Sequence, residues 1–332
     1  MMTYGRRIES KCLMALAATY LAVSTAAFAA EGRFQRTLQV TGPVALTVQT
    51  GAGTITVRTG GDSSVEVRGT IQASNGFFSN GDAGRKVAYL ELNPPIEQDG
   101  NVIKIGIVAA SGMQHNVSIS YELVVPTNTQ IKSRSGSGNQ TIEGVSGSLE
   151  ASAGSGNIRV SNIGASVQAT TGSGEIVLEN VKEGVRASTG SGTVRATGVG
   201  GSVRASTGSG DVTVAQTGVA DARISTGSGN IILKQARGLV HARTASGSIT
   251  AEGGGQLPWY LESASGNVSV RVPPDLGFDL RAHTVSGNIS TSRPLTLQGT
   301  LNKREITGKA GRGGFLLDIS TVSGNIHIDW VA

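Results

Sequence analysis

The sequence predicts an all-β protein: a parallel β-solenoid of the β-helix or β-roll type, with coils of about 18 residues and an irregular N-terminal β cap. Three observations support this fold class. A Gly-Ser-Gly tripeptide recurs at a nearly fixed spacing, the residues around it alternate between apolar and polar, and 48 of the 332 residues are glycine. Alternation with a period of two is typical of strands, and a short fixed repeat is typical of stacked coils.

The repeat is clearest after residue 130. Successive Gly-Ser-Gly copies are 18 residues apart, except for a last step of 19, and later copies keep only Ser-Gly. Apolar residues stand six positions before the serine (Leu149, Val167) and three positions after it (Ile158, Ile176). Each repeat therefore supplies two short strands joined by a turn, and stacking buries apolar columns that one coil cannot bury alone.

The second glycine of each tripeptide is predicted to hold the turn, because a reversal in so few residues needs a positive φ, which glycine adopts without steric cost. These structural turn glycines are Gly138, Gly156, Gly174, Gly192, Gly210 and Gly229. The next residue is often asparagine, and stacked asparagines are able to hydrogen-bond along the rod.

Three segments follow from the pattern. Residues 1–29 read as a signal peptide, with Arg6 and Arg7 before an apolar stretch and an Ala-Phe-Ala cleavage site. Residues 30–130 are expected to hold the first coil or coils and the irregular cap, with strands at 87–92, 102–108 and 117–125. Residues 131–332 are expected to form the regular solenoid, with a basic, Gly-rich insertion at about 299–313 as a flexible loop before the last coil.

The net charge and the cysteine content limit the possible partners and the cellular location of the protein. The net charge of +5 falls to +3 once residues 1–29, with three basic and one acidic residue, are removed, which is too mild to indicate nucleic-acid binding. No second apolar run long enough for a membrane span follows. The single cysteine, Cys12, lies in the signal segment. We expect an exported protein that is periplasmic, on the cell surface or secreted.

Several motifs together resemble a known family. The strand 121–126, the repeated Gly-Ser-Gly followed by Asn, Asp or Glu, and the closing segment 321–326 are similar to exported bacterial adhesins with β-strand repeats. That family is a domain of unknown function, similar in style to the head GIN autotransporter adhesins. The resemblance covers residues 40–332 and implies a β-solenoid with a surface or envelope role. It supplies no catalytic residues.

Chemistry-bearing residues are sparse. Glu175 and Asp211 fall in one column two coils apart, near the upper separation of an inverting carboxylate pair, but no third polar group converges on them. They read as turn residues. Calcium needs more oxygen ligands than the repeats offer, and the four histidines share no metal-ligand spacing. We predict no catalytic residue, no metal and no cofactor.

One outward column, five positions before the serine, carries consecutive arginines. Arg186, Arg204 and Arg223 would stack as a basic stripe that binds an anionic ligand, such as an envelope polysaccharide or another anionic surface polymer, or else form a solvated face. Trp259 is expected to point inward and Tyr260 outward. The predicted function is a non-enzymatic adhesin or envelope interaction protein, with self-association left open. The alternatives are a solenoid carbohydrate-active enzyme and a purely structural spacer.

Overall fold

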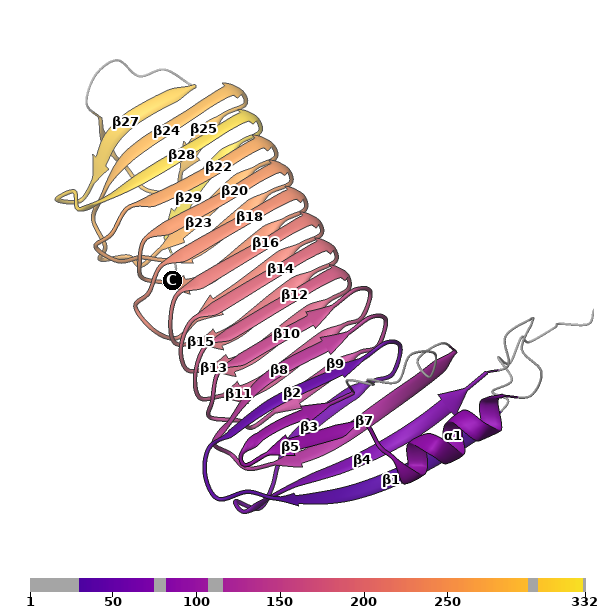
Figure 1. Ribbon diagram of the computed structural model, residues 1–332. Coiled ribbons are helices and arrows are strands. Elements are labelled where there is room, and N and C mark those ends of the chain that lie inside the picture. The colour runs from indigo at the N-terminus through magenta and orange to yellow at the C-terminus, as the bar shows by residue number, and fades with distance from the viewer. Residues whose placement is uncertain (1–29, 75–81, 107–115, 298–303, 331–332) are drawn as a thin grey trace, which may run out of the picture.

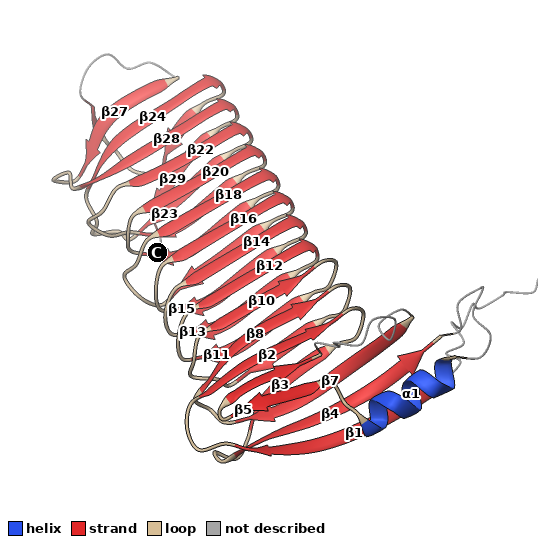
Figure 2. Cartoon of the chain, viewed as in Figure 1, coloured by secondary structure: helices blue, strands red, loops and turns tan. Residues whose placement is uncertain are grey.

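The protein is a rod of stacked coils with an additional layer at its N-terminal end (Figure 1). The computed structural model describes residues 30–74, 82–106, 116–297 and 304–330. Within them two sheets, of 14 and 15 strands, run the length of the rod, and we call them sheet A and sheet B. Strands make up almost all of the regular structure (Figure 2). The predicted all-β parallel solenoid is confirmed.

Sheet A contains, in spatial order, β1 (Ala30–Gln39), β4 (Ser64–Ala73), β7 (Val117–Val125), β3 (Ile55–Thr59), β9 (Gln140–Glu143), β11 (Ile158–Ile163), β13 (Ile176–Val181), β15 (Val194–Val199), β17 (Val212–Gln216), β19 (Ile231–Ala236), β21 (Ile249–Gly253), β23 (Val268–Val272), β29 (Ile326–Trp330) and β25 (Ile289–Thr291). Sheet B contains β26 (Thr296–Leu297), β27 (Glu305–Ala310), β24 (Phe278–Ser286), β28 (Phe315–Ser323), β22 (Trp259–Ser265), β20 (Val240–Ser246), β18 (Ala222–Ser228), β16 (Val203–Ser209), β14 (Val185–Ser191), β12 (Val167–Ser173), β10 (Leu149–Ala153), β8 (Thr129–Ser135), β2 (Val44–Thr50), β6 (Val102–Ile105) and β5 (Ile96–Asp99). One helix, α1 (Ala83–Leu92), is described.

Each regular coil contributes one strand to each sheet. Strands of neighbouring coils pair in parallel with equivalent residues opposite each other, as between β14 and β16 in sheet B and between β15 and β17 in sheet A. The inward side chains of both sheets are buried, for example Val185 and Ala187 against Val194 and Ala196. Alanine in two of these four places keeps the core narrow, so the sheets lie close together.

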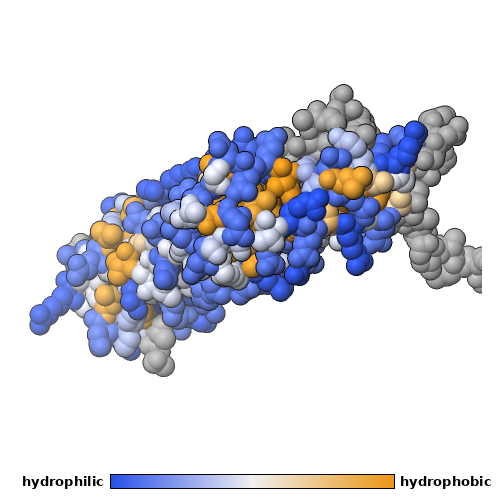
Figure 3. Space-filling view, turned by 60° about the horizontal axis from the view of Figure 1, so that its bottom comes forward, coloured by the Kyte–Doolittle hydropathy of each residue, from blue (hydrophilic) through white to orange (hydrophobic). Residues whose placement is uncertain are grey.

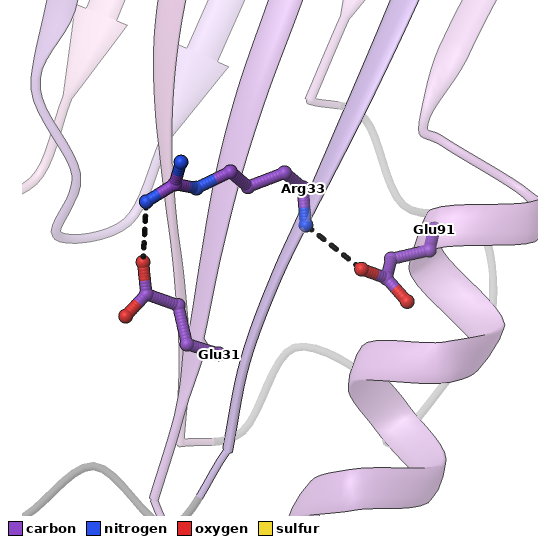
Figure 4. Close-up of polar contacts among 3 residues, drawn as sticks. All are labelled: Glu31, Arg33 and Glu91. Atoms are coloured by element: carbon purple, nitrogen blue, oxygen red, sulfur yellow. Dashed lines mark hydrogen bonds and ion pairs between the residues drawn. The ribbon is translucent and has the colours of Figure 1, made fainter.

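The N-terminal cap differs from the expectation in one element. Residues 87–92, expected as a strand, belong to helix α1, which packs on β1 and β4. Its buried residues Ala83, Val87 and Leu90 are spaced by four and three, the helical period, over a segment too short for that period to be evident in the sequence. Glu91 at the end of the helix accepts a hydrogen bond from the backbone N–H of Arg33 at 2.8 Å (Figure 4).

The order of the coils at the C-terminal end also differs from the expectation. The coil of β28 and β29 was expected to be the last of the rod, but it lies between the coil of β22 and β23 and that of β24 and β25. The N-terminal end shows the same pattern, because β2 lies between β8 and β6, which are both later in the sequence. Each end of the rod is therefore interlocked.

The insertion before β28 is a loop only in part. Glu305–Ala310 forms β27, which pairs antiparallel with β24, so the expectation of a flexible loop is wrong for these residues, and 298–303 lie outside the described residues. β27 occupies the hydrogen-bonding edge that β24 would otherwise expose. The expected signal segment, residues 1–29, also lies outside the described residues. Among the described residues, no helix is both long and apolar enough to cross a membrane.

Candidate functional site

The outward face of sheet B carries the predicted arginine column. Arg186 on β14 pairs in register with Arg204 on β16, and Arg204 pairs with Arg223 on β18. All three side chains are exposed. Because strands of a sheet are about 4.8 Å apart and the register has no offset, the three arginines form a straight row along the rod axis.

This row lies in a groove. A cavity of about 770 Å³ runs along sheet B from the coil of Ala45 to that of Arg223, and all three arginines line it. A second hollow of about 410 Å³ shares Arg204 and Arg223 and continues to Tyr260. We call the two together the arginine groove. In the view of Figure 3 the surface of the rod is mostly hydrophilic, with apolar side chains gathered in groups between the hydrophilic ones.

Small side chains make the groove. The outward positions on one side of the arginine row are Ser188, Ser206 and Ser225, and the hydroxyl of Ser206 donates a hydrogen bond to that of Ser188 at 3.2 Å. On the other side are Gly184, Ser202 and Asp221, whose carboxylate accepts a hydrogen bond from the backbone N–H of Leu239 at 3.3 Å. These side chains are short, so the guanidinium groups stand between two shallow troughs.

Several charged residues near the arginine row on sheet B are ion-paired. Glu150 forms ion pairs with Lys132 at 3.8 Å and Arg134 at 3.5 Å. In the second hollow Arg243 pairs with Glu262 at 3.8 Å, and beyond Tyr260 Arg281 pairs with Asp318 at 3.4 Å. Among the described residues, none of the three groove arginines has a carboxylate within 4.0 Å.

Two aromatic rings continue the arginine column. His241 pairs in register with Arg223 and with Tyr260. The rings of His241 and Tyr260 stack with centroids 4.7 Å apart and an interplanar angle of 13°. Tyr260 is half-buried on the outward face, while Trp259 is fully buried and donates from Nε1 to the carbonyl of Gly238 at 3.2 Å. Because the faces of the two rings stack on each other, a ligand in the groove would meet the ring edges, which carry the N–H of His241 and the O–H of Tyr260.

The turn glycines are required for two different reasons. Gly192, Gly210 and Gly229 have φ of 152°, 145° and 157°, in a region that only glycine adopts readily. Gly174, predicted to share this conformation, has φ outside that region, as do Gly138 and Gly156. At all six positions, however, an added Cβ would lie under 3.0 Å from a backbone carbonyl oxygen of the adjacent coil. Close approach of successive coils is the common cause.

The residues after these glycines form a ladder along the rod. The side-chain oxygen of one coil accepts a hydrogen bond from the backbone N–H of the equivalent residue in the next coil, as between Asn139 and Asn157 and between Asn157 and Glu175, both at 2.9 Å. Asp211 accepts from the N–H of Asn230 at 2.7 Å in the same way. Glu175 accepts from the hydroxyl of Thr193 at 3.4 Å. Both carboxylates thus belong to the ladder.

The histidines have separate surroundings. His327 Nδ1 lies 2.9 Å from the hydroxyl of Ser290, but the nearby carboxylate of Asp329 accepts from Ser292 at 2.6 Å and from the Trp330 N–H at 2.9 Å. The hydrogen bonds from Ser292 and Trp330 lower the pKa of Asp329. Within the ranges the structure covers, no group of three or more His, Cys, Asp or Glu side chains is arranged to hold a metal ion. His115 lies outside these ranges.

A column of threonines stands two positions before the repeat serine, at Thr171, Thr189, Thr207, Thr226 and Thr244, and the sequence does not reveal its role. These buried hydroxyls donate to the carbonyl of the turn glycine one coil away, as Thr207 does to Gly192 at 2.9 Å and Thr226 to Gly210 at 3.0 Å. At the second corner of the coil, the positive φ of Asn162 and Asn180, 57° and 55°, was not predicted, and the recurrence of Asn at one repeat position was the available signal.

Tyr121 was also missed, since a tyrosine in a strand carries no special sequence signal. It is almost fully buried in the cap, and its hydroxyl has no hydrogen-bond partner in the described part of the chain. Burial raises the pKa of this phenol well above its usual value. The ring also contacts Phe34 edge-on, with centroids 6.4 Å apart.

Fold and groove together define a parallel β-solenoid with a cationic surface groove. The chain belongs to the Toastrack DUF4097 family, a domain of unknown function whose model matches residues 44–329. The family predicted from the motifs is thereby supported. No curated protein matches the chain.

Solved structures that match the chain come from species of Bacteroides, Parabacteroides and Clostridium. A protein from Bacteroides fragilis described as a "putative adhesin" is 13% identical, with a TM-score of 0.30 over 90% of this chain and 97% of that one. A "putative lipid binding protein" from Parabacteroides distasonis is 13% identical, with a TM-score of 0.37 over 91% and 97%. A "putative cell adhesion protein" from Clostridium sporogenes is 12% identical, with a TM-score of 0.23 over 90% and 100%.

Proposed function

We propose that this Toastrack protein is an exported, non-enzymatic β-solenoid that binds an anionic polymer of the cell envelope through the arginine groove. The observation that carries the proposal is the row of Arg186, Arg204 and Arg223, in register and without a carboxylate partner among the described residues. Two unit charges about 4.8 Å apart repel by about 1 kcal/mol in water, and a bound anion removes that repulsion.

Export is part of the proposal and rests on the sequence. The basic start, apolar stretch and Ala-Phe-Ala site of residues 1–29 are typical of a cleaved signal peptide. Polymers of the periplasm and cell surface would then be within reach of the groove. Mass spectrometry of protein recovered outside the cytoplasm should find a chain that begins near Ala30, and an intact N-terminus there would contradict export.

The enzymatic alternative has less support. Glu175 and Asp211 share a column, but each is hydrogen-bonded within the ladder that joins successive coils. In the groove itself, hydrolysis or elimination would need an acid or base aimed at one bond. The row of arginines instead presents one chemical group repeated along an axis, which suits binding of a repeating ligand.

The experiment compares two triple variants in binding to a carboxylated polymer and to a polyphosphate. Arg186→Gln, Arg204→Gln and Arg223→Gln together should weaken binding about 10- to 100-fold at low salt, because each exposed contact is worth about 0.5–1 kcal/mol. The control is Arg68→Gln, Arg134→Gln and Arg281→Gln, which removes three arginines that are already ion-paired and that line neither hollow of the groove.

Both variants lose the same net charge and keep their sheets, so they separate a specific groove from general attraction. The difference between them should shrink as salt is raised. Equal weakening in both variants, or unchanged binding in the first, would contradict the proposal.

A further inference from the structure

The column that contains the groove arginines has a defined length. Six consecutive coils each place one outward residue in this column. In order along the rod these residues are Gln168, Arg186, Arg204, Arg223, His241 and Tyr260. Every one of them is able to donate a hydrogen bond, and none carries a negative charge. Glu150 precedes Gln168, and Asp318 follows Tyr260.

The second boundary depends on the interlocked coil order. In the sequence, the repeat after Tyr260 places Arg281 in this column, which would extend the positive row. In the structure, β28 lies between β22 and β24, so the neighbour of Tyr260 is Asp318, and Arg281 is one coil further and paired with Asp318. Carboxylates therefore bound the donor row at both ends.

The spacing and surroundings of the row indicate the class of polymer. Successive donors are separated by one strand spacing, about 4.8 Å, which is close to the length of one sugar ring in an extended chain. A guanidinium matches the planar carboxylate in two hydrogen bonds. The trough beside the row offers the hydroxyls of Ser206 and Ser225, and its lining also includes the apolar side chains of Ala205, Ile224 and Ala242. A sugar ring carries both hydroxyls and apolar C–H faces, so it suits this mixed lining.

Building on the proposed function, we infer that the groove binds a linear polysaccharide of uronic acids, extended along the rod axis with one sugar for each coil. The site holds six sugars, from Gln168 to Tyr260. Glu150 and Asp318 are ion-paired with neighbouring cations and offer no hydrogen-bond donor to an acidic chain, so the donor row, and with it the length of the contact, ends at these two residues.

The experiment measures binding of the full chain to purified oligogalacturonates of two to ten sugars by calorimetry. We expect affinity to rise by about threefold for each added sugar up to about six and then to level off, since further sugars find no donor. A ladder of polyphosphates of matched charge should bind more weakly and show no such plateau. Affinity that rises steadily to ten sugars, or that is equal for three and six, would overturn the inference.

Two single variants provide a second measurement. Arg204→Gln, in the middle of the row, should weaken hexamer binding about tenfold, and Arg281→Gln, beyond Asp318, by less than about twofold. Glu150→Gln removes one boundary, so the plateau should move to longer oligomers without loss of fold. If the paired triple variants differ as proposed above but polyphosphate binds better than uronates of every length, the groove is an anion site and only the sugar assignment fails.

Discussion

The substitution Gly192→Ala tests why the turn of each coil requires glycine. Two costs follow from the structure. Its φ of 152° lies in a region that costs an alanine about 1–3 kcal/mol. The new Cβ would also lie under 3.0 Å from the carbonyl oxygen of Gly174, and relief of such overpacking costs about 1–3 kcal/mol more. The free energy of unfolding should therefore fall by about 2–6 kcal/mol.

Two matched glycines separate the causes. Gly174→Ala meets the same kind of carbonyl without the left-handed φ, so it should lose only the steric part, about 1–3 kcal/mol. Gly61→Ala meets no heavy atom within 4 Å and should change stability by less than about 1 kcal/mol. Denaturant unfolding followed by circular dichroism measures all three. If Gly192→Ala and Gly61→Ala unfold at the same denaturant concentration, close approach of the coils is not what selects glycine.

Three further outcomes are expected, each measured by unfolding. Thr207→Val removes the buried hydroxyl that donates a hydrogen bond to the carbonyl of Gly192, so the free energy of unfolding should fall by about 1–3 kcal/mol. Thr170 is exposed, so Thr170→Val should leave the free energy of unfolding almost unchanged. Equal losses in the two variants would refute the role of the threonine column. Asn230→Ala removes the acceptor for the backbone N–H of Ser248, so the free energy of unfolding should fall by about 0.5–1.5 kcal/mol. Asn230→Asp keeps an acceptor oxygen and should keep most of the stability. An equal loss in both variants would argue against the ladder. Tyr121→Phe tests the buried phenol: because its pKa is raised in the folded protein, stability should be full below pH 10 and fall above it by up to about 1.4 kcal/mol per pH unit. The phenylalanine variant should lack this part of the fall, and identical alkaline profiles would contradict it.

The repeated part of the fold could be predicted because every coil packs against its neighbours in the same way. Columns such as Val185, Val203 and their equivalents recur at one interval, since each must occupy the same place in a stack. The order of the coils is a different matter. Ser265, Ser286 and Ser323 fit the same column whichever way their coils are stacked, because identical columns carry no information about which neighbour is next.

The site was predictable to the same degree. The row of three arginines follows directly from the repeat, and the structure places the three in register in a groove. The carboxylate boundary at Asp318 depends on the coil order, so the sequence could not supply it. The two reasons for glycine could not be separated either, because Gly174 and Gly192 both end the same tetrapeptide, Thr-Gly-Ser-Gly, although only Gly192 has a φ between +20° and +160°.

The interlocked C-terminal end has a consequence for how the chain is made. A ribosome delivers β24 and β25 before β28 and β29, yet the later coil belongs between β22 and the earlier one. Simple addition of each new coil therefore cannot build this end of the rod, because β22 gains its native neighbour only when residues 315–330 arrive. The coil of β24 and β25 must stay off the edge of β22, or leave it, before β28 can pair there. Insertion of β28 and β29 is thus the step that closes this end of the rod.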